Sequence, residues 1–332
     1  MSRAVVAHER WFVADQQFPV DFAAFFTSQT WIPLGIATGI TLAAVALWRM
    51  RGRRPLVPGP LALGMPWSNY LQVLSWMPLV IGVHTAVPLL VSGVTLQLFV
   101  PNLVLSRDFL GGILGLAEIV VGLSLFYGAL SRIGAVVLAV LWLAGVLLFG
   151  PILLLEHTLF LGVAFFIFVT GRGPLAFDMA LTRLHRPLEP LVPYAVPSLR
   201  ILTGFGIVVL AFTEKLWNLP MGLAFLQQHH FNFFSGLGIQ GVGDREFLLI
   251  AGTVELTFGL LLMSGAFIRL IILLLWLPFN LTLPFLGWRE LVGHLPIYGI
   301  FALLLIWGET EPQTERAMVE GIEKRDRHGS TQ

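Results

Sequence analysis

The stretch GLAEIVVG (115–122) recurs as GTVELTFG (252–259), and this recurrence decides how the chain is interpreted. Both stretches follow the pattern G-x-x-E-x-x-x-G, with Glu118 and Glu255 at the same place. Each lies inside a long apolar run, where an ionisable side chain is expensive and therefore informative.

The match extends beyond the glutamates without a gap. Fourteen residues after each glutamate comes an arginine, Arg132 or Arg269, and twenty-five residues later a histidine, His157 or His294. A glycine closes each unit another fourteen residues on. Identical residues at fixed offsets over more than fifty positions indicate an internal duplication.

The composition indicates a protein that lives in a membrane. Of the 332 residues, 56% are hydrophobic and 12% are charged, with a mean hydropathy of +0.83. Soluble domains carry about 25% charged residues, so this chain has too few to cover a water-exposed surface. The absence of cysteine excludes disulfides and thiolate metal sites. A net charge of +1 argues against nucleic acid as a partner.

Apolar runs of suitable length predict an all-α integral membrane protein with about nine transmembrane helices. They lie at 31–50, 70–100, 109–129, 132–153, 157–171, 198–217, 246–265, 268–287 and 294–308. Four of them fall in each unit, so both units enter the membrane from the same side, and the first span stands outside the repeat. The units are then parallel, related by a pseudo-twofold axis along the membrane normal.

The expected organisation has five parts. They are an N-terminal amphipathic segment and first span (1–60), a first four-helix repeat (65–171), a Pro- and Arg-rich linker (172–197), a second repeat (198–308) and a polar tail (309–332). Part of 10–28 is expected to lie along the membrane surface as an amphipathic helix.

Lysine and arginine predict the orientation. With the N-terminus outside, fourteen of the twenty basic residues lie on the cytoplasmic side, in the segments between spans and in the tail. This bias predicts an outside N-terminus and a cytoplasmic C-terminus in the cell (inner or plasma) membrane.

The second unit resembles the DoxX family of small four-helix membrane proteins. The resemblance rests on FGIVVLAFTEKLWN (205–218), a helix that ends in a Lys–aromatic segment, and on GTVELTFGLLLMSGAFIR (252–269). The first unit keeps the second element as GLAEIVVGLSLFYGALSR (115–132) but has no lysine on its opening helix. The chain departs from the family pattern as a tandem fusion with an additional first span.

The resemblance implies a role near quinone chemistry. The family is associated with quinol oxidation beside terminal oxidases, with thiosulfate:quinone oxidoreductases and with membrane-anchored oxidative-stress complexes. Quinone is thus the cofactor that the resemblance suggests, and a soluble or membrane oxidoreductase subunit is the partner, besides membrane lipids.

Glu118 and Glu255 are the candidates for catalysis, and two interpretations remain open. In one, they handle protons or hydrogen-bond a quinone oxygen. In the other, a neutral or paired glutamate ties the helices of one bundle together.

The histidines supply weaker candidates. His157 and His294 begin the last span of each unit, and if both faced the pseudo-twofold axis they could ligate one haem or one metal ion. The alternative is an ordinary hydrogen bond at the membrane interface. His84 lies mid-span in the first unit and has no counterpart in the second.

The segment 217–246 is too polar to span and too apolar for a free loop. With Lys215 at its edge, it carries His229 and His230 among aromatic side chains. These residues could cap a pocket on the outer face and meet the polar head of a quinone or lipid, or the segment could be an interfacial amphipathic helix. Its GLGIQG (236–241) follows no strand, so it is not a dinucleotide site.

Two functions fit the sequence. The first is a DoxX-like membrane protein of a redox-linked complex that binds a quinone or similar apolar cofactor near the outer face. The second is a non-catalytic scaffold, or a carrier for a lipid or small solute, because parallel repeats with carboxylates at mid-depth also suit a carrier.

Overall fold

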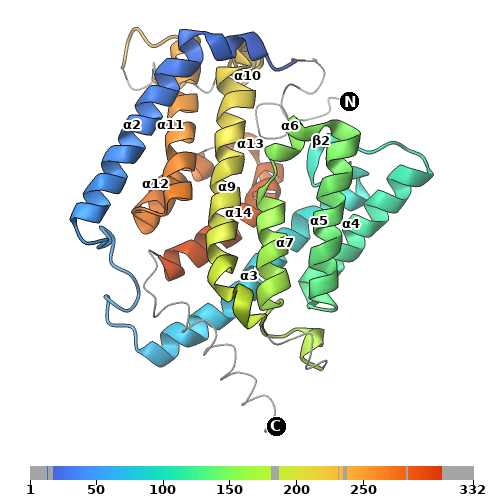
Figure 1. The fold of residues 1–332 in the computed structure, drawn as a ribbon. Coiled ribbons are helices and arrows are strands. Elements are labelled where there is room, and N and C mark those ends of the chain that lie inside the picture. Colours follow the sequence, from blue (N-terminus) through green and yellow to red (C-terminus); the bar gives the residue numbers. More distant parts are fainter. Residues whose placement is uncertain are drawn as a thin grey trace.

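A computed structural model describes residues 13, 18–180, 187–230, 232–234, 238–281 and 283–308. The described chain is a bundle of helices with one small hairpin (Figure 1). Among the described residues, seven helical stretches are long and apolar enough to cross a membrane. They are α2 (Ser28–Met50), α3 (Trp67–Val94), α4 (Phe109–Tyr127), α5 (Ser131–Phe149), α9 (Val192–Leu210) continuing into the π-helix η4 (Ala211–Leu216), α11 (Asp244–Ser264) and α14 (Trp288–Trp307).

Shorter elements complete the described chain. They are the 3₁₀ helices η1 (Phe22–Phe26), η2 (Phe177–Ala180) and η3 (Glu189–Leu191), the helices α6 (Pro151–Leu155), α7 (Leu159–Thr170), α10 (Leu219–His229), α12 (Ile268–Leu281) and α13 (Leu283–Leu286), and the strands β1 (Gln97–Leu98) and β2 (Val100–Val104).

The outward surface of the bundle is apolar. On α2, α4 and α5, the side chains of Leu42, Phe109 and Leu147 are 64%, 84% and 88% exposed. Side chains of this kind at such exposure would be costly in water, whereas lipid accommodates them at no cost. The chain is therefore an all-α, multi-pass membrane protein.

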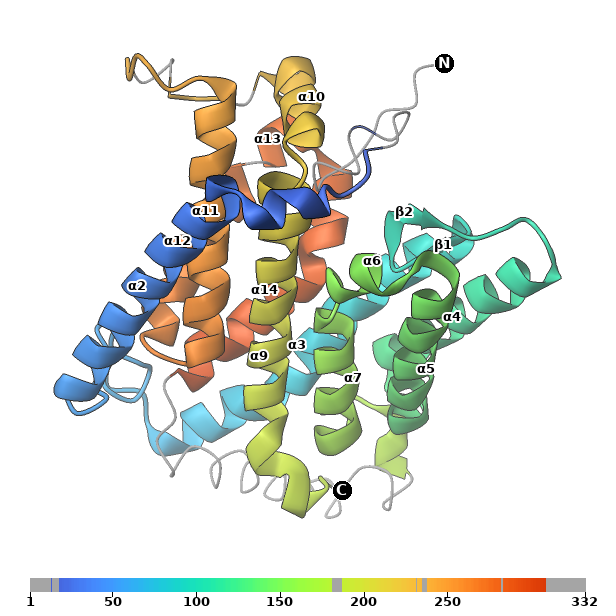
Figure 2. The ribbon, with the colours of Figure 1, turned by 45° about the horizontal axis from the view of Figure 1, so that its top comes forward.

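The helices gather in two groups that α3 connects (Figure 2). One group holds α4 to α7 and the hairpin, and the other holds α2 and α9 to α14. Helix α3 packs against α4 and also against α14, while α7 packs against α9 and α2 packs against α11. The contacts between the groups therefore run through α3–α14 and α7–α9.

Two of the nine expected spans are shorter than a membrane crossing requires. Helix α7 has 12 residues and α12 has 14. The helix at the expected span 70–100 is long enough to cross but ends before residue 100, because α3 stops at Val94 and the chain turns into the hairpin. The structure thus supports seven spans by length, not nine.

The turns after α4 and α11 have the same backbone geometry. Gly128 and Gly265 end these helices in the left-handed region, with φ of +65° and +80°. Two residues later Leu130 and Phe267 are also left-handed, with φ of +54° and +52°. A bulky residue at positive φ is uncommon. Leu130 and Phe267 are 137 positions apart, the offset of the repeat, so this shared conformation is a specific likeness between the two units. Further glycines at positive φ stand at the same offset: Gly150 with Gly287, and Gly171 with Gly308.

Two glycines allow the groups to approach closely. A Cβ added at Gly162 on α7 would lie 3.2 Å from the Cα of Leu199 on α9. A Cβ added at Gly299 on α14 would lie 3.3 Å from the Cα of Ile81 on α3. Small residues at such points let membrane helices gain van der Waals contact along their backbones.

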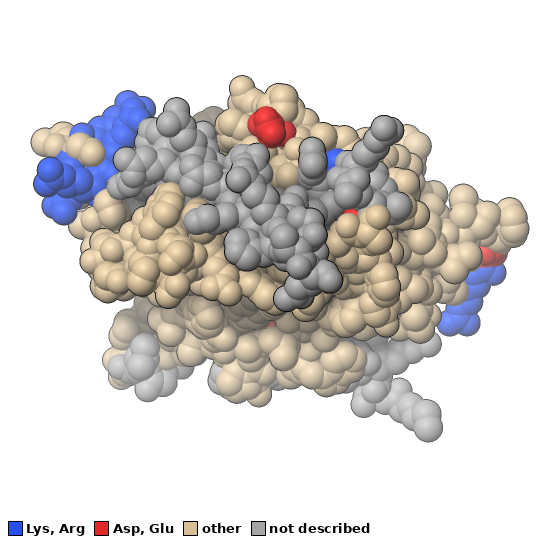
Figure 3. Space-filling model, turned by 90° about the horizontal axis from the view of Figure 1, so that it is seen from below, with Lys and Arg blue, Asp and Glu red and all other residues tan. Residues whose placement is uncertain are grey.

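One edge of the molecule is basic. Seen from below (Figure 3), Lys and Arg gather where α2 ends. That end carries Arg49, Arg51, Arg53 and Arg54, all exposed. A smaller group of Lys or Arg with an acidic neighbour lies at the opposite edge of this view.

Three expected segments fall wholly or partly outside the described residues. Residues 10–12 and 14–17 of the amphipathic segment 10–28 do, and its described part holds η1, a 3₁₀ helix and not an α-helix. Residues 181–186 of the linker and the tail 309–332 lie outside as well.

Candidate functional site

Glu118 is a fully buried carboxyl group held by the first helix of its own unit. Its side chain on α4 is 0% exposed. Its Oε1 accepts a hydrogen bond of 2.8 Å from the Ser92 hydroxyl on α3 and one of 2.7 Å from the Phe99 backbone N–H. Glycines bring the two helices together here, because a Cβ added at Gly93 would lie 2.8 Å from the carbonyl oxygen of Gly115.

The Phe99 N–H belongs to the tight turn of the hairpin. Leu98 pairs with Val100, so Phe99 alone forms the turn, with φ of +65°. This conformation costs about 1–2 kcal/mol for a residue with a Cβ. The Phe99 ring stacks on Phe160 at 4.7 Å, and its N–H is bound by Glu118. The carboxyl group therefore fixes a strained turn.

The other oxygen of Glu118 is unused. Oε2 is buried and has no hydrogen-bond partner among the described residues. Both donors to Oε1, Ser92 and Phe99, line a cavity of about 190 Å³ between the end of α3, the hairpin and the start of α14. Trp288 and Val292 line its α14 side. A buried polar atom without a partner is rare enough to need an explanation.

Glu255 is held differently. On α11, its Oε1 lies 2.9 Å from Nζ of Lys215, which is part of the π-helix η4. The side chains are 36% and 11% exposed, respectively. Both glutamates therefore contact the opening helix of their own unit, Glu118 through neutral donors and Glu255 through a cation. Lys215 is thus engaged inside the bundle, and its contact with the head group of a quinone or lipid stays a prediction.

The two histidines of the segment 217–246 lie at the far end of α10. His229 ends α10, with its ring 5.0 Å from that of Phe225, and His230 follows at φ of +50°. Burial lowers the pKa of His229, and the neighbouring His230 lowers it further. His229 is therefore neutral at pH 7.

The histidines at the matched positions of the two units are packed inside the protein. His157 is buried between α6 and α7, and His294 is buried in α14 with its ring 4.7 Å from Phe279. Glu290 lies 3.4 Å from Nδ1 of His294. In the part of the chain that the structure describes, no group of three or more His, Asp or Glu side chains is arranged to hold a metal ion. Ligation of haem or metal by His157 and His294 stays a prediction.

His84 faces the second group of helices. Its Nδ1 lies 2.7 Å from the carbonyl oxygen of Val80 on the same helix. A Cβ added at Gly299 would lie 3.1 Å from the Cβ of His84, which places His84 at the contact between α3 and α14.

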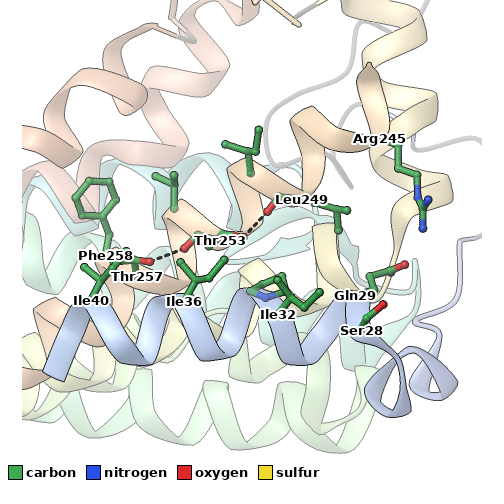
Figure 4. Close-up of a pocket in the computed structure, with 13 residues that line it drawn as sticks. Ser28, Gln29, Ile32, Ile36, Ile40, Arg245, Leu249, Thr253, Thr257 and Phe258 are labelled. Atoms are coloured by element: carbon green, nitrogen blue, oxygen red, sulfur yellow. Dashed lines mark hydrogen bonds between the residues drawn. The ribbon is translucent and has the colours of Figure 1, made fainter. Parts of the chain in front are cut away.

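A second, larger hollow lies between α2 and α11 (Figure 4). This α2–α11 groove has a volume of about 660 Å³. Arg245, Gln29 and Ser28 lie at one end, and isoleucines of α2 extend along it. Thr253 and Thr257 on its α11 wall donate their hydroxyls to backbone oxygens of their own helix. The sequence analysis missed this groove, because nothing in the sequence pairs the first span with α11.

The sequence analysis also missed Ser92 and Phe99. A serine within an apolar run is a weak signal, and a backbone N–H carries no signal at all. The chain matches no family model, no curated protein and no solved structure. The resemblance to the DoxX family therefore remains an expectation that rests on the sequence pattern.

Proposed function

We propose that the chain is a tandem duplication of a four-helix unit, with nine helices embedded in the membrane and the units related by a twofold axis along its normal. The bounds of the elements support this. When α5 is shifted by 137 positions it covers 268–286, which is the range of α12 and α13 together. The same shift moves 151–170, which contains α6 and α7, to 288–307, which is the range of α14. The shared left-handed turn residues support it as well.

The contacts between the units support the same arrangement. Gly162 of the first unit meets Leu199 on the opening helix of the second, and Gly299 of the second meets Ile81 on the opening helix of the first. Gly162 and Gly299 are equivalent at the repeat offset of 137, and the two opening helices are equivalent by their order within the units. A twofold axis produces this kind of reciprocal contact.

Replacing Gly162 or Gly299 with alanine tests the reciprocity. Each variant should lower the free energy of unfolding by about 1–3 kcal/mol, because the added methyl group forces a packed backbone apart. Gly35→Ala in α2 is the control, since a Cβ there meets nothing within 4 Å. Thermal unfolding in detergent measures all three. A loss in only one of Gly162→Ala and Gly299→Ala would argue against equivalent contacts.

For the function, we propose that the protein binds a quinone-class molecule in the Glu118 cavity, as part of a redox-linked complex. The observation that carries the proposal is the unused Oε2 of Glu118, a residue whose two hydrogen-bond donors, Ser92 and Phe99, line that cavity. A cavity of about 150 Å³ accommodates benzene, so about 190 Å³ suffices for one ring. Phe99 and Trp288 supply aromatic surface to it.

The chemistry of Glu118 suits a carbonyl oxygen. Both of its described partners are neutral, and an isolated carboxylate in this setting would cost several kcal/mol, so we infer the neutral acid. Because Oε1 accepts the bond from the Phe99 N–H, we infer that the proton is on Oε2, which can then donate to a ring oxygen. The electrons for any quinone reduction would come from an oxidoreductase partner, as the family resemblance implies.

A quinone with a short tail and a photoreactive group tests the proposal. Crosslinks in the purified protein should map to 88–101 or 288–293. Val91→Trp, which fills the rim of the cavity, should abolish the crosslink, whereas Val120→Trp on the exposed face of α4 should leave it unchanged. Crosslinking that is unsaturable, or unaffected by Val91→Trp, would contradict the proposal.

The second candidate function is a non-catalytic scaffold, or a carrier for a lipid or small solute. Each glutamate joins two helices of its own unit, which is what a purely structural role requires. Absence of saturable quinone binding would favour this candidate. In either case we propose the cell (inner or plasma) membrane, with the arginine-rich end of α2 in the cytoplasm and the N-terminus outside.

A further inference from the structure

The α2–α11 groove has the dimensions of a lipid tail. Ile32, Ile36 and Ile40 of α2 line it and are 60%, 49% and 48% exposed. Leu249 and Phe258 form part of the α11 wall. From Ser28 to Ile40 the groove follows α2 for about 18 Å at 1.5 Å per residue. This is close to one leaflet, about half of a 30 Å hydrocarbon core.

Helix α2 packs against α11 but buries few of its own side chains. Only three of its 23 residues are buried, namely Thr30, Pro33 and Ala37. Membrane helices associate mainly through van der Waals packing, and a groove of about 660 Å³ beside α2 leaves much of that packing unmade. An apolar occupant would supply it.

The polar end of the groove favours negative charge. Arg245 lies there, exposed, and forms no ion pair with any residue that the structure describes. Figure 4 shows it above Gln29 and Ser28, at the start of α2. No side chain caps that helix start, so its positive dipole end is available to an anion. Two acidic residues flank Arg245 in the sequence: Asp244, which accepts a hydrogen bond from Asn232, and Glu246. Neither of them lines the groove, so Arg245 is the charged side chain that faces it.

We propose that the α2–α11 groove binds one anionic phospholipid, whose phosphate lies between Arg245 and the start of α2. One acyl chain follows the isoleucines of α2 and the wall of α11. The lipid thereby completes the packing of α2 against the second unit. This site is separate from the Glu118 cavity and does not depend on quinone binding.

Native mass spectrometry of the delipidated full-length protein tests the proposal, with phosphatidylglycerol and phosphatidylcholine as probes. Wild type should retain one phosphatidylglycerol in preference to phosphatidylcholine. Arg245→Gln should reduce that preference about fivefold, since one basic residue near an anionic lipid is worth about 1 kcal/mol. Arg51→Gln, at the other end of α2, is the matched control.

A second pair of variants tests the tail. Ile36→Trp fills the groove and should remove both lipids, whereas Leu42→Trp, on the same helix but outside the groove, should remove neither. Equal retention of the two lipids by wild type would overturn the proposal. So would an equal change in lipid retention for Arg245→Gln and Arg51→Gln, or for Ile36→Trp and Leu42→Trp. A dimer in place of a bound lipid would also overturn it, because the groove would then be an interface between copies.

Discussion

Replacing Glu118 with leucine is expected to lower the free energy of unfolding by about 2–4 kcal/mol. The buried Phe99 N–H would be left without an acceptor, at about 1–3 kcal/mol, whereas the Ser92 hydroxyl keeps the carbonyl oxygen of Pro88 at 2.6 Å, so its loss is a net hydrogen bond of about 0.5–1.5 kcal/mol. The Ser92 hydroxyl and the Phe99 N–H would both lose their bond to Oε1. Phe99 would in addition keep a left-handed backbone with nothing to hold it. Unfolding by SDS titration from mild detergent provides the measurement.

Glu118→Gln is the matched control for this loss. Glutamine keeps an oxygen that accepts both bonds, and its amide group has nearly the same size, so it should change the stability by less than about 1 kcal/mol. If glutamine destabilises as much as leucine, the two hydrogen bonds are not the reason. If leucine costs nothing, Glu118 does not hold the hairpin.

Breaking the ion pair of the second unit is expected to have the next largest effect. Glu255→Gln should cost about 2–3 kcal/mol, because it leaves the largely buried Lys215 without this counter-charge. The loss should stay below the 3–5 kcal/mol of a fully buried pair, since the Glu255 side chain is 36% exposed. Lys215→Met should destabilise by a similar amount.

The double variant Lys215→Met/Glu255→Gln distinguishes a direct pair from two unrelated losses. When two residues interact, removing both costs less than the sum of the single losses, by about 0.5–3 kcal/mol. We expect such a coupling in the same unfolding measurement. Strict additivity would mean that the 2.9 Å contact between Nζ and Oε1 contributes nothing.

The positions of the helices follow closely from the apolar runs, but their lengths do not. Helix α7 is short because protein surrounds it: none of its residues is exposed, so the thickness of the lipid does not set its length. At the end of the apolar run 70–100, the sequence does not show where the helix stops and the hairpin begins. Residues 97–104 are as apolar as the helix before them, and an apolar run alone does not distinguish a buried strand from a helix.

The candidate site was predictable only in part. Glu118 and Glu255 stand out because acidic residues are costly at that depth. Their different partners do not follow from the pattern. Lys215 lies forty positions before Glu255 and on a π-helix, a rare conformation that sequence periodicity does not indicate. The partners of Glu118 include a backbone N–H, which every non-proline residue has.

The packing of α14 against α3 has a consequence for how the molecule is made. Chains leave the ribosome from the N-terminus, and a bundle can close only when the helices that contact each other have all emerged. Here the last of the described helices covers the second. The early helices must therefore wait in the translocon or the surrounding bilayer, with the glycine-contacting face of α3 uncovered, until synthesis is almost complete.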